Sequence, residues 1–256
     1  MSATTTNAGL SVPGLRGHLW RILAAPVVVA VVAAGVAIWL AGADLDSIEE
    51  RTLNGPYIFA RVSEHLQLSL AASALVAVLA IPAGVLIHRS QSRLLRVVVL
   101  ALANIGQATP AVGVVILLAI VWKTGFTTAL IALVAYAFLP VLRNTLTGLA
   151  EVDDAVRESA LGMGMTRTQV LFRIELPLAS PVILAGLRTS LVFAVGVATI
   201  ATFINAGGLG DMIVNGLKLQ RYPVLVVGAG LVAAIAILID WLASLVEEYA
   251  RPRGLS

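Results

Sequence analysis

Residues 158–177 read ESALGMGMTRTQVLFRIELP, a polar stretch that lies between apolar runs long enough to cross a membrane. Just before it, Asp153 can cap a short helix that extends through Leu161. Gly162 and Gly164 then end that helix, since glycine adopts the left-handed conformation found at helix C-termini. The first half of the stretch therefore predicts one short helix with a carboxylate and two small side chains on it.

The second half predicts another helix. Thr166 and Gln169 have the spacing of a capping box, and the helix would run from Arg167 to about Glu175, where Pro177 helps to stop it. The whole polar segment, residues 143–180, thus reads as a compact helix–turn–helix at the membrane surface.

The composition places the rest of the chain in lipid. Of the 256 residues, 59% are hydrophobic and only 12% are charged, too few to cover a soluble globule of this size. The backbone has no water to bond within a bilayer, so each apolar run must be a helix. Six spans are predicted, at residues 22–41, 66–87, 97–122, 126–142, 182–204 and 224–246.

The third span carries polar residues. Asn104, Gln107 and Thr109 precede Pro110, which is expected to bend the helix. These side chains, together with Asn205 beyond the fifth span, are our candidates for the wall or gate of a translocation path. A tolerated kink without such a role is the alternative.

Arginine and lysine set the orientation. The positive-inside rule puts the N-terminus, the 143–180 segment and the C-terminus in the cytoplasm. The predicted inner set is Arg16, Arg21, Arg89, Arg93, Arg96, Arg143, Arg157, Arg167, Arg173, Arg251 and Arg253; the outer set is Arg51, Arg61, Lys123, Lys218 and Arg221. The first run could instead be a cleaved signal, but its length favours a retained span.

Two ionisable residues lie well inside predicted spans, Arg188 in the fifth and Asp240 in the sixth. Both fall roughly 10 Å from the inner surface at helical rise. They are candidates for an intramembrane ion pair, and separate snorkelling of each charge to the interface is the alternative.

In the outer segment 205–222, glycines permit a turn, and Asp211 is expected to cap a short helix. The histidines, His18, His65 and His88, each lie at the edge of an apolar run, which favours interfacial placement over a metal site.

Several function classes are excluded or disfavoured. Neither lysine, Lys123 or Lys218, stands in a Gly-Lys-Ser/Thr context, so the chain has no P-loop and ATP with its Mg²⁺ would be bound by partner subunits. The chain has no cysteine. A DNA-binding role for the 143–180 segment is disfavoured because its carboxylates would repel phosphates, and packing on lipid headgroups would require a more continuous basic face.

A site that docks another protein is a better interpretation of the polar segment. Small side chains beside Glu158 would let another protein approach closely while the carboxylate reaches an arginine or a helix N-terminus. Glu158, Ser159 and Ala160 followed by Gly164, Ile174 and Leu176-Pro177 resemble the EAA motif of importer-type ABC permeases. Ser159 stands where that motif usually has alanine.

The resemblance extends over residues 66–249 and is nearest to permeases for glycine betaine, carnitine and choline, the osmoprotectant family. It implies a type I importer fold, no enzymatic activity or bound cofactor in this chain, and coupling to the ATPase through Glu158, Ser159, Ala160 and Gly164. The implied partners are cytoplasmic ATP-binding subunits, a second permease copy or paralogue, and an extracytoplasmic solute-binding protein.

The resulting layout has a disordered cytoplasmic tail (1–21), a first span with an external segment (22–65), the permease domain (66–249) containing the cytoplasmic coupling loop 143–180, and a second tail (250–256). A methionine or other small amino-acid importer is the alternative within transport. An ion-gradient-driven transporter would need carboxylates at the membrane centre and inverted repeats, neither of which is evident. A membrane-tethered scaffold would function without an ATPase.

Overall fold

The computed structural model describes residues 15–90 and 92–250, and every regular element within them is helical. The long helices are α1 (Leu15–Ala41), α3 (Gly55–Arg89), α6 (Phe126–Ala150), α9 (Leu176–Ala198) and α11 (Tyr222–Ala250). The shorter elements are α2 (Ser47–Thr52), α4 (Arg93–Ala108), α5 (Ala111–Val121), α7 (Asp154–Gly162), α8 (Arg167–Val170), the π-turn η1 (Leu171–Glu175), the 3-10 turn η2 (Thr199–Ile204) and α10 (Gly210–Lys218). The predicted all-α class is confirmed.

The core lies between α3, α6 and α9, which pack closely along much of their length. Small residues allow this approach, as is usual for helices in lipid, where apolar burial by itself does not drive association. Alanines supply much of the buried surface: Ala72, Ala80, Ala129, Ala132, Ala137, Ala194 and Ala198. Glycines allow the closest approaches: a Cβ at Gly186 on α9 would lie 2.6 Å from the Cβ of Asn144 on α6, and one at Gly84 on α3 would lie 2.6 Å from the Thr145 side chain.

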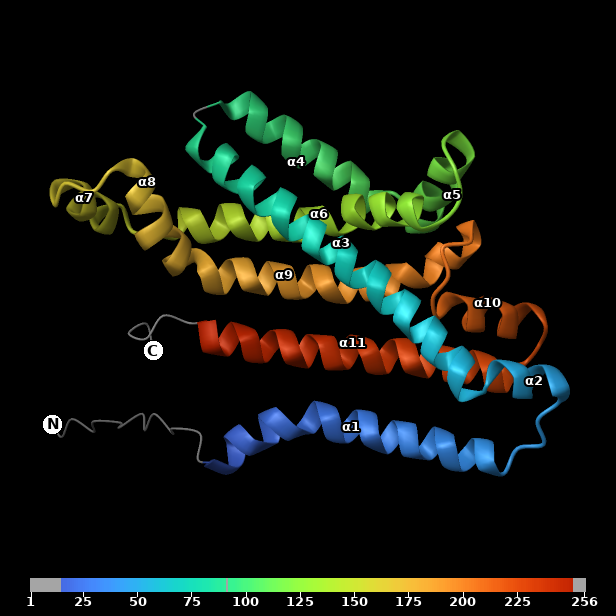
Figure 1. Ribbon diagram of the computed structural model, residues 1–256. Coiled ribbons are helices and arrows are strands. Elements are labelled where there is room, and N and C mark those ends of the chain that lie inside the picture. Colours follow the sequence, from blue (N-terminus) through green and yellow to red (C-terminus); the bar gives the residue numbers. More distant parts are fainter. Residues whose placement is uncertain (1–14, 91, 251–256) are drawn as a thin grey trace, which may run out of the picture.

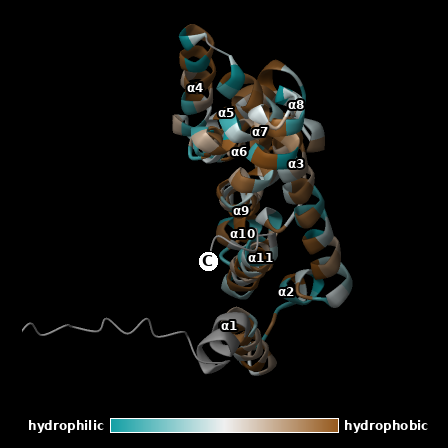
Figure 2. Cartoon of the chain, turned by 90° about the vertical axis from the view of Figure 1, so that its left-hand side faces the viewer, coloured by the Kyte–Doolittle hydropathy of each residue, from teal (hydrophilic) through white to brown (hydrophobic). Residues whose placement is uncertain are grey.

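The remaining long helices form successive layers beyond this core. In Figure 1, α11 lies beside α9, and α1 lies beyond α11. The start of α1, the end of α11, the α3–α4 turn and the pair α7–α8 share one end of the molecule, whereas α2 and α10 lie at the other (Figure 1). In the end-on view of Figure 2, α1 lies at the edge of the bundle, and none of residues 23–41 is fully buried, although Val36 and Leu40 pack against the rest of the chain.

The third predicted span is broken rather than bent. Its two halves, α4 and α5, meet at Thr109 and Pro110 at an angle of 99°. Pro110 offers no N–H to continue the ladder and forces Thr109 into an extended conformation, with φ −74° and ψ 138°. Within residues 15–90 and 92–250, five helical runs are long and apolar enough to cross a membrane, and the predicted six is reached only when this bent pair counts as one span.

Two boundaries of the 143–180 segment differ from prediction. Helix α6 continues to Ala150, so the segment's first residues belong to a long helix. Pro177 does not stop a helix: the run from Arg167 to Ile204 is continuous. The π-turn η1 lies within this run and ends two residues before Pro177. Its wider i→i+5 bonding accommodates the ring and the missing N–H of the proline.

The N-terminal boundaries also shift. Helix α1 begins at Leu15, so residues 15–21, expected in the tail, are helical, and residues 1–14 lie outside the described part. Residues 251–256 of the predicted second tail lie outside it too. Helix α3 begins at Gly55 rather than near residue 66, with Asn54 capping it through the N–H of Tyr57 at 2.9 Å.

The outer segment 205–222 forms the expected turn and short helix, but Asp211 is not its cap. The turn places Asn205, Gly207 and Gly208 at φ 58°, 79° and 92°, in the left-handed region. Helix α10 begins at Gly210 after Leu209, with no side-chain cap. Its first turn packs so closely on the backbone of η2 that a Cβ at Gly210 would overlap the carbonyl of Thr199.

Candidate functional sites

Helix α7 has the capped form that the sequence predicts. The Asp153 carboxylate accepts a hydrogen bond from the N–H of Ala155 at 2.8 Å. At the other end Gly164 has φ 85°, and the next N–H, that of Met165, donates to the carbonyl of Ala160 at 3.2 Å. The αL glycine therefore satisfies carbonyls that the end of the helix would leave free.

The four predicted coupling residues do not share one face. Glu158, Ser159 and Gly164 are exposed, whereas Ala160 is only 1% exposed and packs against its own chain. Ala160 therefore faces the protein's own interior, and direct contact with a partner stays a prediction for Glu158, Ser159 and Gly164. An outward carboxylate remains available on α7, because Glu158 takes part in none of the ion pairs found among the described residues.

Helix α8 begins with the predicted capping box. The Gln169 side chain accepts from the N–H of Thr166 at 2.8 Å, and the Thr166 hydroxyl accepts from the N–H of Gln169 at 3.3 Å. Both bonds fix the start of the helical run that leads through η1 into α9.

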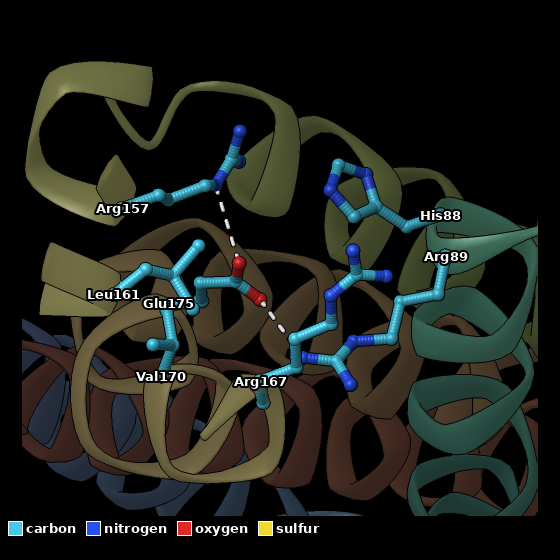
Figure 3. A pocket seen from close by; sticks show the side chains of 7 residues that line it. All are labelled: His88, Arg89, Arg157, Leu161, Arg167, Val170 and Glu175. Carbon is cyan, nitrogen blue, oxygen red and sulfur yellow. Dashed lines mark hydrogen bonds and ion pairs between the residues drawn. The ribbon is translucent and has the colours of Figure 1, made fainter. Parts of the chain in front are cut away.

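An ion cluster that the sequence did not reveal lies beneath α7. Glu175, in η1, is 7% exposed and meets the Nε of Arg157 at 3.2 Å and the Nη2 of Arg89 at 3.7 Å. Figure 3 shows these three side chains in a cavity of about 350 Å³, which His88, Leu161, Arg167 and Val170 also line. The charges come from α7, η1 and the end of α3. Arg89 is far from the other two in sequence, and Arg157 and Glu175, 18 residues apart, meet because of the fold of the loop, so no helical spacing could have paired them.

Arg157 is held on three sides. Besides Glu175, its guanidinium contacts the carboxylate of Asp154 at 2.5 Å and donates to the carbonyl of Leu149, near the end of α6, at 2.5 Å. Arg89 donates to the carbonyl of Arg167, at the start of α8, at 2.7 Å. The planar guanidinium suits such multiple bonds, and the cluster ties α7 and α8 to α3 and α6.

The candidate path residues are only partly gathered. Asn104, Gln107 and Thr109 lie along α4 and at its break, all half-buried. The Asn104 amide donates to the carbonyl of Leu100 at 2.7 Å, and its oxygen accepts from Arg143 of α6 at 2.6 Å. Asn205 is exposed in the turn after η2, and none of the hydrogen bonds between described residues joins it to the other three.

Arg188 of α9 and Asp240 of α11 form a bidentate ion pair. The Nε and Nη2 of the arginine lie 2.5 and 2.6 Å from the two carboxylate oxygens. Glu247 lies 3.7 Å from the Nη1 of the same arginine. The structure thus brings the two side chains together rather than leaving each to reach the interface separately.

A second ion cluster that the sequence did not reveal lies at the other end of the molecule from α7 and joins α3 to α10. Arg61 of α3 lies 2.9 Å from Glu64 and 3.2 Å from Asp211 of α10, with its guanidinium 5.3 Å from the centre of the Tyr57 ring. Glu64 also accepts from the N–H of Gly208 at 2.8 Å. Asp211, the expected helix cap, instead binds α10 to α3 through Arg61.

Two further residues fasten this end. His65 is fully buried between helices, with its Nε2 3.0 Å from the carbonyl oxygen of Val195. Asp46 forms an ion pair with Arg221. The Asp46 carboxylate also accepts a hydrogen bond from the N–H of Glu49, and this bond lowers the pKa of Asp46.

Comparison with known proteins identifies the family. Residues 80–251 match the family described as "binding-protein-dependent transport system inner membrane component". The carnitine transport permease protein OpuCD of Listeria monocytogenes is 42% identical over 200 residues, 78% of this chain and 89% of that protein. The choline transport system permease protein OpuBD of Bacillus subtilis is 40% identical over 78% of this chain and 88% of that protein.

Solved structures show the same fold. The chain resembles one in the inward-facing MetNI methionine ABC transporter with a TM-score of 0.68 and 20% identity, over 78% of this chain and all of that one. An amino acid ABC transporter gives a TM-score of 0.65 at 19% identity, over 81% of this chain and all of that one. The arrangement of α3 to α11 is therefore the transmembrane fold of type I ABC importers, and the chain belongs to the family of binding-protein-dependent transport system inner membrane components, the membrane permease subunits of ABC importers.

Proposed function

We propose that this chain is the permease subunit of an ATP-driven importer of quaternary-ammonium osmoprotectants such as glycine betaine, choline or carnitine. The observation that carries the proposal is the identity of 42% to a carnitine permease and 40% to a choline permease over 78% of the chain. The structural likeness to a methionine transporter, at 20% identity, concerns the fold and not the solute.

The proposed assembly places two copies of the permease, or this chain and a paralogue, over two ATP-binding subunits and beneath a solute-binding protein. The partner subunits bind ATP and Mg²⁺, since this chain has no P-loop. The exposed Glu158, with Ser159 and Gly164 nearby, would dock into the ATP-binding subunit, where a charge-assisted bond to an arginine or a helix N-terminus suits a carboxylate.

The arginine-rich end then faces the cytoplasm, together with both termini. Arg89, Arg157 and Arg167 gather around the cavity at this end, as the positive-inside rule requires of short inner loops. Helix α10 and the turn before it face outward, toward the binding protein. In the path between, Asn104, Gln107 and Thr109 would supply polar groups beside the break in the third span.

Solute uptake tests the function directly. The permease is purified with its ATP-binding partner, reconstituted into liposomes with the binding protein, and given radiolabelled glycine betaine, choline, carnitine or methionine. We expect ATP-dependent accumulation of at least one of the first three and none of methionine. Accumulation of methionine alone would refute the proposed solute class.

Labelling of single cysteines tests the orientation, and the natural chain, which has no cysteine, provides the background. In intact cells, Lys218→Cys on α10 should react with a membrane-impermeant maleimide, and Ser159→Cys on α7 should react only after the cells are opened. The reverse pattern would invert the proposed topology.

A further inference from the structure

The cluster around Glu175 joins the side of α7 that faces the bundle to the helices that cross the membrane. Arg157 comes from α7, Arg89 from the last turn of α3, and Glu175 itself from η1, which runs without interruption into α9. The carboxylate therefore lies where the docking helix, one core helix and the start of another meet.

The chemistry of the site makes this contact stiff. Glu175 is nearly buried, and a buried carboxylate without a cationic partner is strongly unfavourable. Arg157 is also bound to Asp154 within α7 and to the carbonyl of Leu149 at the end of α6. A displacement of α7 must therefore either carry Glu175 with it or separate an ion pair whose carboxylate is nearly buried.

The backbone beyond Glu175 can pass such a displacement on. It is the last residue of the π-turn η1, and the next residue opens α9, which packs against α3, α6 and α11. A π-turn is a local departure from α-helical bonding and is often found at functional positions. Glu158, in contrast, points outward from α7 and contacts none of these helices through an ion pair.

We propose that Glu175 is the positioning residue through which movement of α7 reaches the transmembrane helices, by way of its ion pairs with Arg157 and Arg89. This role rests on the proposed function, because the movement originates in the ATP-binding subunit. It separates two tasks within one loop: Glu158 holds the partner, and Glu175 transmits its motion to α9 and α3.

The test compares Glu175→Gln, which keeps the size and removes the charge, with Glu151→Gln, an exposed carboxylate at the end of α6. Each complex is reconstituted at equal permease content, and solute uptake, ATP hydrolysis and retention of the ATP-binding subunit are measured together. For Glu175→Gln we expect full retention, hydrolysis within about twofold of wild type, and uptake per ATP reduced at least tenfold. Glu151→Gln should match wild type.

A purely structural role would lower retention, hydrolysis and uptake in parallel and leave uptake per ATP unchanged, and that result would overturn the proposal. If Glu175→Gln does not reach the membrane, Glu175→Asp decides instead: it keeps the charge but draws it back by one methylene from both arginines. Its uptake per ATP should be reduced severalfold, and a wild-type ratio would overturn the proposal.

Failure of the proposed function gives a different pattern. A wild-type complex that hydrolyses ATP but accumulates none of glycine betaine, choline and carnitine would refute the solute class, and one without a retained ATP-binding subunit would refute the assembly and this role with it. A wild-type complex that couples uptake to hydrolysis, beside a Glu175→Gln complex that does so equally well, would refute the role of Glu175 alone.

Discussion

The ion pair between Arg188 and Asp240 offers the sharpest test of how charge stabilises this bundle. Asp240→Asn removes one charge and leaves the Arg188 guanidinium with a neutral partner and with Glu247 at 3.7 Å. The side chains of the pair are 34% and 43% exposed in the isolated chain. Because the pair joins two helices that cross a membrane, we expect salt to screen it less than a pair on a surface in water.

The loss of stability expected for Asp240→Asn lies between two limits. An exposed pair in water contributes at most about 1 kcal/mol, and a charge at the centre of a helix in hydrocarbon costs about 2.5–3.5 kcal/mol. Asp240 precedes Glu247 by two helical turns, roughly 10 Å, so a freed Arg188 can partly reach the interface. We therefore expect Asp240→Asn to cost about 2 kcal/mol, or a fall of about 4–8 °C in the unfolding temperature of a chain this size.

The assay is thermal unfolding of the purified permease in detergent and in nanodiscs, for Asp240→Asn, Arg188→Gln and the double variant. The double variant should lose less than the sum of the two single variants, because it leaves neither charge without its partner. Additive losses, or single variants within 1 °C of wild type in nanodiscs, would show that the pair contributes nothing specific and refute the reasoning.

Three further predictions concern other parts of the molecule. Gly186→Ala should lower the abundance and the unfolding temperature, at a cost of about 1–3 kcal/mol, because the new Cβ meets the α6 side chain opposite at 2.6 Å. Glu158→Ala should reduce retention of the ATP-binding subunit and uptake while the permease stays folded, since this carboxylate is exposed. Arg61→Ala should speed amide exchange in residues 205–210 about fivefold, because it releases two carboxylates of a network that contributes about 1 kcal/mol.

Each of these has a clear contrary result. Gly196→Ala is the matched control for the first, since no atom lies within 4 Å of a Cβ there, and equal losses at both glycines would point to helix propensity or lipid contact rather than to packing. Wild-type uptake and retention in Glu158→Ala would remove α7 as the docking helix. Unchanged exchange in Arg61→Ala would show that the backbone turn alone holds the outer segment.

Local sequence signals predicted well where the responsible interaction is itself local. The cap at Asp153 and the capping box of Thr166 with Gln169 involve groups two or three residues apart, and both appear as expected. A signal failed where the helix boundary itself was misplaced. Asp211 was expected to cap α10, but the helix begins one residue earlier, at Gly210, and the Asp211 carboxylate instead binds Arg61, 150 residues away.

Helix ends were the weakest part of the prediction. A proline normally ends a helix, yet the π-turn before Pro177 lets the helical run continue into the membrane. Pro110 was expected only to bend its helix, but it separates two helices at 99°, and the second of them, α5, packs against α6 and η2. A proline fixes its own φ and removes one donor, but the neighbouring helices decide how the chain responds.

The sequence by itself determined that this protein lies in a lipid bilayer and that its fold is all-α. Its apolar runs cannot be covered in water, and a backbone in lipid has to be helical, so composition and run length suffice for a multi-pass bundle. The motif at Glu158 to Pro177 further indicated an importer permease, because its residues are fixed by spacing along one short segment.

Only the tertiary structure decided which charges meet. Arg89, Arg157 and Glu175 lie on three elements, and Arg61 and Asp211 lie on α3 and α10. The pairing of Arg188 with Asp240 depends on α9 lying beside α11. Ala160, a small residue in a docking motif, turned out to be buried by its own chain. Ion pairs depend on distances of a few ångströms between groups far apart in sequence, and these distances are set by helix packing, which hydropathy and spacing do not specify.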